Sequence, residues 1–234
     1  MRKVQFIEDG VYHIYNRGAD KRKIFTGDSD YLRFISSVSG FNTTKPVELA
    51  RILRRRNLRK KENCGGFASA LVPASEKLVK ILYFVLMPNH FHLVLQQVAA
   101  GGVEKFMQKL GTGYTMYFNK KYKRSGVLFQ GVFKAISIEA ESYIMQISSY
   151  IHLNPLKLIE PEYKKKGVSD LERARLFLRN YRWSSYLDFL GVKNFPFLID
   201  NELHKGYFRN SAEYEDFVLS GIAADTGGGF ALTT

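Results

Sequence analysis

Residues 81–95 have the sequence ILYFVLMPNHFHLVL and predict a tight hairpin of two strands. Every residue from 81 to 87 is apolar, as in a strand that is covered on both faces, and Pro88-Asn89 then supplies a turn. In the second strand a period of two places His90 and His92 on the same face. The sequence therefore predicts a hairpin with two imidazoles near its tip.

The elements around this hairpin are expected in the order β-α-β-β-α-β-α. Alternation and turn residues predict strands at 11–16 and at 127–138, and helical spacing of apolar residues predicts helices from Asp28 or Ser29, over 103–118 and over 141–154. A tight hairpin between the two middle strands makes this the split βαβ plan of ferredoxin-like domains. We therefore expect an α+β fold, with an antiparallel sheet and helices on one face.

We expect one main domain over residues 1–160, with a basic insertion at 41–79. A C-terminal helical extension with a flexible tail is expected over 161–234, including a short element at Trp183-Ser184-Ser185-Tyr186. Cys64 is the only cysteine, which excludes an intramolecular disulfide and a thiolate zinc cluster. No window reaches about 18 uninterrupted apolar residues, so we expect a cytoplasmic protein without a membrane partner.

The charge balance favours a nucleic-acid partner. Lys and Arg number 35 against 22 acidic residues, giving a formal charge of +13. Two basic clusters stand out, and a solvated basic surface is the alternative interpretation for each. The first cluster is Arg51, Arg54, Arg55, Arg56, Arg59, Lys60 and Lys61, and the second is Lys120, Lys121, Lys123 and Arg124.

Two histidines on one strand face lie about 6 to 7 Å apart, so both imidazoles can reach one divalent ion. The alternative is a pair of hydrogen-bonded or exposed histidines. Tyr150 and Asn154 lie four residues apart on one face of the predicted helix. A phenol and an amide oxygen would converge with the histidines if this helix packs beside the hairpin, although a tyrosine is more often a packing residue.

Five motifs together resemble the REP-associated tyrosine transposases. The motifs are YHIYNRG at 12–18, MPNHFHLVL at 87–95, FQGVFKA at 129–135, YIHLNPLK at 150–157 and WSSY at 183–186. These proteins are relatives of the single-tyrosine (IS200-like) transposases of the HUH endonuclease superfamily, and the resemblance runs from about residue 5 to residue 220. Val132 departs from the pattern, because relatives often carry a basic residue just before the aromatic of the third motif.

The resemblance implies a metal-dependent endonuclease and strand transferase for single-stranded DNA that carries a hairpin or palindrome. It implies that His90 and His92 bind Mg²⁺ or Mn²⁺, that Asn154 completes the ligand set, and that Tyr150 attacks the phosphate. The product would be a 5′-phosphotyrosyl intermediate with a free 3′-hydroxyl. The chain would act as a monomer or a homodimer.

Phosphate contacts are expected from residues outside this catalytic set. Arg17 follows the first strand, and the second basic cluster follows the long helix. In the first cluster we expect Arg54, Arg55 and Arg56 to grip phosphates without sequence preference.

Two other functions compete with this interpretation. A domesticated hairpin-binding protein with little or no cleavage would not need the complete set of His90, His92, Tyr150 and Asn154. A two-histidine phosphoesterase would need a second H-x-[ST] motif, and the sequence contains none.

Overall fold

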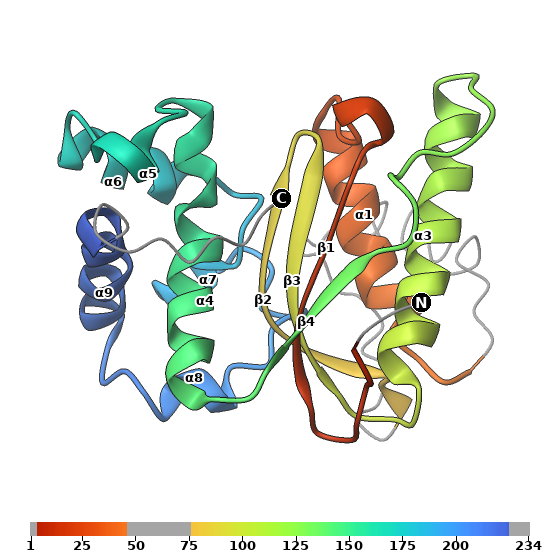
Figure 1. Ribbon diagram of the computed structural model, residues 1–234, viewed down its shortest axis with the longest axis horizontal. Coiled ribbons are helices and arrows are strands. Elements are labelled where there is room, and N and C mark those ends of the chain that lie inside the picture. Colours follow the sequence, from red (N-terminus) through yellow and green to blue (C-terminus); the bar gives the residue numbers. More distant parts are fainter. Residues whose placement is uncertain (1–3, 46–75, 225–234) are drawn as a thin grey trace, which may run out of the picture.

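The computed structural model describes residues 4–45 and 76–224, whose centre is a four-stranded antiparallel sheet (Figure 1). Its strands are β1 (Val11–Arg17), β2 (Val79–Met87), β3 (His90–Gln97) and β4 (Lys134–Ile138), in the order β2-β3-β1-β4. The predicted hairpin is confirmed, with Met87 paired to His90 across its turn. This order is that of the ferredoxin-like plan, which places β3 and its histidines between two hydrogen-bonded neighbours.

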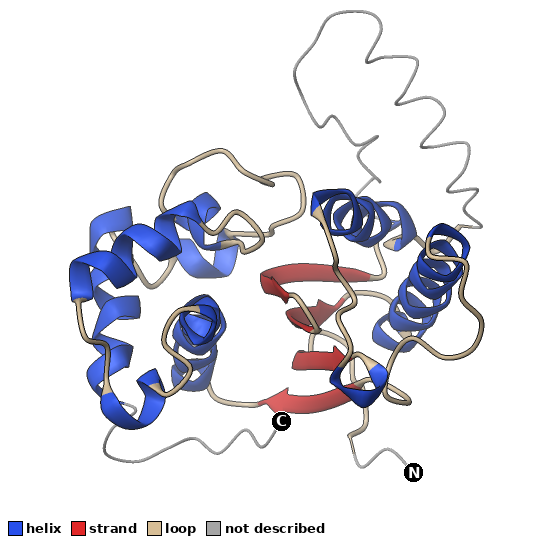
Figure 2. Cartoon of the chain, turned by 90° about the horizontal axis from the view of Figure 1, so that it is seen from above, coloured by secondary structure: helices blue, strands red, loops and turns tan. Residues whose placement is uncertain are grey.

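Helices cover both faces of the sheet (Figure 2). The two helices of the split βαβ unit, α1 (Asp28–Phe41) and α3 (Gly102–Lys121), share one face as expected and pack on Phe91. The expectation of helices on one face only is wrong, because α4 (Glu141–Leu153) covers the other face. The strands require this cover, since Val85 and Val94 present apolar side chains to α4.

Two element boundaries shape the site. Only residues 134–138 of the expected strand 127–138 form β4, because Gly126 and Gly131 adopt φ of +82° and +71° and turn the chain. The α-helix ends at Leu153, and a 3₁₀ helix, η3 (Asn154–Leu158), follows because Pro155 lacks the N–H that would continue the helix.

The C-terminal helices form a layer with α4, and the chain between the second and third of them also meets the edge strand β2 at Val85 (Figure 1). They are α5 (Tyr163–Lys166), α6 (Leu171–Asn180), α7 (Tyr186–Phe189), α8 (Glu202–Lys205) and α9 (Ser211–Ala224). His152 of α4 joins this layer to the sheet. Its Nδ1 lies 2.6 Å from the Tyr214 hydroxyl and its Nε2 lies 2.8 Å from Ser185 Oγ, which in turn accepts a hydrogen bond from the Phe84 amide.

The first basic cluster, including Arg54, Arg55 and Arg56, lies outside the described residues, as does the expected flexible tail after residue 224. Within the described ranges, no helix is long and apolar enough to cross a membrane.

Candidate active site

His90 and His92 project from β3 toward α4, as the period-two pattern predicts. Their ring centroids lie 5.1 Å apart and their planes are almost perpendicular, at 88°. His92 is fully buried and His90 is half-buried. The two imidazoles therefore converge on one region between the sheet and α4.

The hydrogen bonds of both rings are compatible with a lone pair on Nε2 that can bind a ligand. His90 Nδ1 lies 2.7 Å from Asn89 Oδ1, which accepts its proton and so leaves a lone pair on His90 Nε2. His92 Nδ1 lies 2.8 Å from Nε2 of His13 on the neighbouring strand β1. Donation of the His92 Nδ1 proton to His13 leaves a lone pair on His92 Nε2 in the same way. Both Nε2 atoms are buried without a hydrogen-bond partner among the described residues.

All three rings are held neutral by their surroundings. Burial, reinforced by the nearby Lys157 charge, lowers the pKa of His90 to about 4, against an opposing effect of Asn154. Burial lowers the pKa of His13 to about 3 and that of His92 well below its usual value. Neutral imidazole is the form that binds metal ions.

Asn154 supplies a third set of buried donor atoms at the same place. Its side chain lies close enough to His90 to raise the pKa of that ring, yet neither amide atom has a hydrogen-bond partner in the described part of the chain. Buried polar atoms without partners are rare and require an explanation. Two imidazole nitrogens and one amide oxygen fit an exchangeable divalent ion, with positions left for substrate oxygens. No group of three His, Cys, Asp or Glu side chains that could hold a metal occurs in residues 4–45 and 76–224.

Tyr150 reaches the same region from α4. Its half-buried ring meets His92 edge-on, with centroids 5.8 Å apart, and lies 6.2 Å from the ring of His13. Lys164 Nζ of α5 lies 4.1 Å from the centroid of the Tyr150 ring. The structure thus brings together the phenol, the amide and the two imidazoles selected from the sequence, whose roles stay predictions.

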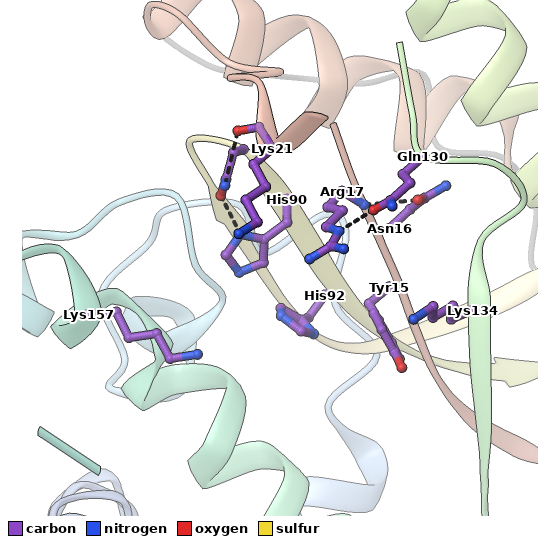
Figure 3. Close-up of a pocket in the computed structure, with 10 residues that line it drawn as sticks. Tyr15, Asn16, Arg17, Lys21, His90, His92, Gln130, Lys134 and Lys157 are labelled. Atoms are coloured by element: carbon purple, nitrogen blue, oxygen red, sulfur yellow. Dashed lines mark hydrogen bonds between the residues drawn. The ribbon is translucent and has the colours of Figure 1, made fainter. Parts of the chain in front are cut away.

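A cavity of about 300 Å³, which we call the cationic cavity, opens beside the histidines (Figure 3). Four of its lining residues are cations, Arg17, Lys21, Lys134 and Lys157, and no carboxylate of the described residues lines it. In Figure 3 Lys157 extends toward His92 from the helix that follows α4, opposite the strands. The other lining residues are Tyr15, Asn16, Asn89, His90, His92 and Gln130. This distribution of charge favours a phosphate next to the two Nε2 atoms.

The predicted phosphate contacts lie in different surroundings. Arg17 lines the cavity and donates from Nε to Gln130. In the second basic cluster, Lys121 forms an ion pair with the buried carboxylate of Asp30, and Arg124 donates to Asn119 at 2.9 Å. Lys120 and Lys123 are exposed. Lys121, although also exposed, and Arg124 therefore have partners within the chain, and Lys120 and Lys123 are accessible to DNA.

Several site residues were not selected from the sequence. Lys134, Lys157 and His13 lie within the quoted motifs, so membership of those motifs was the available signal. Lys21 and Lys164 lie in no motif, and only the fold brings them to the site.

Comparisons with known proteins give one family match. Residues 54–154 match the family model described as "Transposase IS200 like", a span that includes both histidines, Tyr150 and Asn154. No curated protein matches the chain. One solved structure, described as "Structure of the REP associates tyrosine transposase bound to a REP hairpin", is similar with a TM-score of 0.45 and 11% identity, over 87% of this chain and 92% of that chain.

Proposed function

We propose that the chain cuts single-stranded DNA and transfers the cut strand by a metal-dependent reaction at Tyr150. The match of residues 54–154 to the family model of IS200-like transposases supports this proposal. The observation that carries the proposal is the set of orphaned donor atoms. His90 Nε2, His92 Nε2 and the Asn154 amide are buried without hydrogen-bond partners among the described residues, beside a cavity lined by cations.

Each group of residues has one task in this reaction. His90, His92 and Asn154 would hold Mg²⁺ or Mn²⁺, which would neutralise a non-bridging oxygen of the scissile phosphate. Arg17 and Lys157 bind the neighbouring phosphates and hold the strand in register.

Tyr150 supplies the nucleophile. A bond forms between its phenolic oxygen and phosphorus as the bond from phosphorus to the 3′-oxygen breaks, and the phenolic proton ends on that leaving oxygen. The products are a 5′-phosphotyrosyl strand and a free 3′-hydroxyl. One phosphodiester replaces another, so the reaction needs no ATP, and a 3′-hydroxyl from the same or another strand can reverse it.

The test is a covalent protein–DNA band. The chain is incubated with Mg²⁺ or Mn²⁺ and a panel of single strands that carry hairpins, and is then denatured and separated by electrophoresis. We expect a band that carries both protein and labelled DNA, that requires the metal, and that fully paired duplexes do not give. Tight binding without a covalent band under any of these metal conditions would refute cleavage and favour a hairpin-binding protein.

A further inference from the structure

A second cavity, of about 530 Å³, lies on the opposite face of the sheet, between α3 and the irregular segment at 126–133. Figure 1 shows this segment turning back beside α3 before it enters β4. Its floor is apolar, with Phe91 and Phe129 among the lining side chains. On the segment, Val127 and Val132 are 73% and 66% exposed although both line the cavity. We call this cavity the α3 groove.

The two glycines in the interior of α3, Gly111 and Gly113, have different surroundings. A Cβ on Gly113 would lie 2.5 Å from the ring of Phe41, so α1 and α3 could not pack with a larger residue there. A Cβ on Gly111 would meet nothing within 4 Å, and Gly111 lines the groove. A glycine inside a helix destabilises it relative to alanine. Packing therefore accounts for Gly113, whereas Gly111 keeps the groove open at a cost to the helix.

The chemistry of the α3 groove complements that of the cationic cavity. Among the described residues no cation lines the groove, and its polar side chains are the amides of Asn16 and Gln108, the hydroxyls of Thr112 and Thr115, and one carboxylate, that of Glu104. A nucleobase has apolar faces and edges with hydrogen-bond donors and acceptors, which matches an aromatic floor whose rim carries amides, hydroxyls and one carboxylate that can accept from a base N–H. The volume falls within the range of about 300–1,000 Å³ that ligand clefts usually have.

The two cavities adjoin across the end of β1. Asn16 lines both, and its side chain donates to the carbonyl of Gly131 at 3.2 Å. On the same segment Gln130 lines the cationic cavity while Gly131 lines the groove. A strand whose phosphate lies in one cavity can therefore place a neighbouring base in the other.

We propose that the α3 groove binds an unpaired nucleobase of the DNA strand whose phosphate occupies the cationic cavity. This inference rests on the proposed function, because it assigns the strand's phosphates to that cavity. It adds a site that distinguishes a strand with bases from a bare sugar–phosphate chain.

The test compares oligothymidylate with an abasic oligonucleotide of the same length, which carries the same phosphates and no bases. Binding is measured in the Tyr150→Phe chain, so that cleavage does not interfere. Gly111→Leu fills the groove, and Met116→Leu is the matched control, since Met116 lies on the same helix, is 68% exposed and does not line the groove. Leucine favours helix over glycine, so Gly111→Leu should melt no lower than the unsubstituted chain.

We expect the Tyr150→Phe chain to bind oligothymidylate at least about fivefold more tightly than the abasic strand, as stacking of one base allows. Gly111→Leu should remove this preference while leaving the affinity for the abasic strand unchanged, and Met116→Leu should keep both. If Gly111→Leu does not fold, Val132→Ser, at an exposed position, should reduce the preference.

Three results of the binding measurements would overturn the groove assignment. One is equal affinity of the Tyr150→Phe chain for oligothymidylate and the abasic strand. Another is a folded Gly111→Leu chain that keeps the preference for oligothymidylate, and the third is a Gly111→Leu substitution that lowers the affinity for both strands equally. A fall in molecular mass on Gly111→Leu would assign the groove to a second copy of the chain and would also overturn it. Cleavage is judged separately by the covalent band, so a base preference that Gly111→Leu removes, without any covalent band, would keep the groove and reject the nuclease.

Discussion

Replacement of His13 by phenylalanine should weaken metal-dependent activity, although His13 donates no ligand atom. His13 is 1% exposed, and its Nε2 lies 2.8 Å from His92 Nδ1, with the two rings stacked at 5.1 Å. Because burial lowers its pKa to about 3, His13 is neutral and can accept the His92 proton. Phenylalanine keeps a ring of similar size and removes the acceptor.

Two consequences set the magnitude. The Nδ1–H of His92 would be buried without an acceptor, which costs about 1 to 3 kcal/mol. His92 can avoid this cost by moving its proton to Nε2, which removes the lone pair that binds the metal. Loss of a residue that orients a metal-binding histidine usually lowers metal affinity or activity by about 10- to 100-fold, or about 1.4 to 2.7 kcal/mol. The two ranges agree.

The assay is the rate of covalent-band formation as a function of Mn²⁺ concentration. We expect His13→Phe to raise the half-saturating concentration by about 10- to 100-fold, and His13→Gln, which restores an acceptor, to recover part of the loss. His204→Phe is the matched control, because His204 is also a buried histidine bonded to a hydroxyl, Tyr83 at 3.3 Å, but in the C-terminal layer. A folded His13→Phe chain with unchanged half-saturation would refute the orienting role.

Three further predictions concern the ligands and the cations. His90→Ala and His92→Ala should each abolish covalent-band formation in limiting Mn²⁺ while the chain still folds by circular dichroism, and a wild-type rate in either would reject the metal assignment. Lys164→Met removes the ammonium over the Tyr150 ring and should slow formation of the covalent band by about two- to fivefold. The controls Lys164→Arg, which keeps a cation, and Lys165→Met, at the neighbouring position, should not slow it. Equal effects of Lys164→Met and Lys165→Met would show that the contact with Tyr150 has no role. Neutral replacement of three residues of the first basic cluster should weaken binding of all hairpins alike and reduce the log–log salt slope by about 0.7 to 0.9 per lost contact, with an unchanged slope arguing for a solvated surface. Those three residues are Arg54, Arg55 and Arg56.

The hairpin and its histidines were predictable because side-chain direction in a strand depends only on the period of two. The uninterrupted apolar run at 81–87 in β2 and the alternation of β3 therefore predicted both strands and the common face of His90 and His92. The i, i+4 spacing of Tyr150 and Asn154 worked in the same way for α4, since local geometry decides both.

Local pattern does not reveal what covers a face or which distant residues meet. Helix α4 was expected on the same face of the sheet as α1 and α3, whereas it covers the opposite face, which carries the histidines. The uninterrupted apolar run of β2 already required cover on both faces. Strand β4 was predicted too long because the positive φ of Gly131 depends on tertiary contacts. Lys21, Lys134 and Lys157 come from three separate segments, so their convergence on one cavity required the fold.

The most direct test of the account identifies the tyrosine that carries DNA. The rival is Tyr15, which lines the cationic cavity with its ring centroid 5.7 Å from that of His92. Burial raises the pKa of Tyr15, which makes its phenolate harder to form. After reaction with a single-stranded substrate, the covalent complex is digested and the nucleotide-bearing peptide is sequenced by mass spectrometry. The account predicts the adduct on Tyr150 and none in Tyr150→Phe, whereas an adduct on Tyr15, or one that persists in Tyr150→Phe, would contradict it.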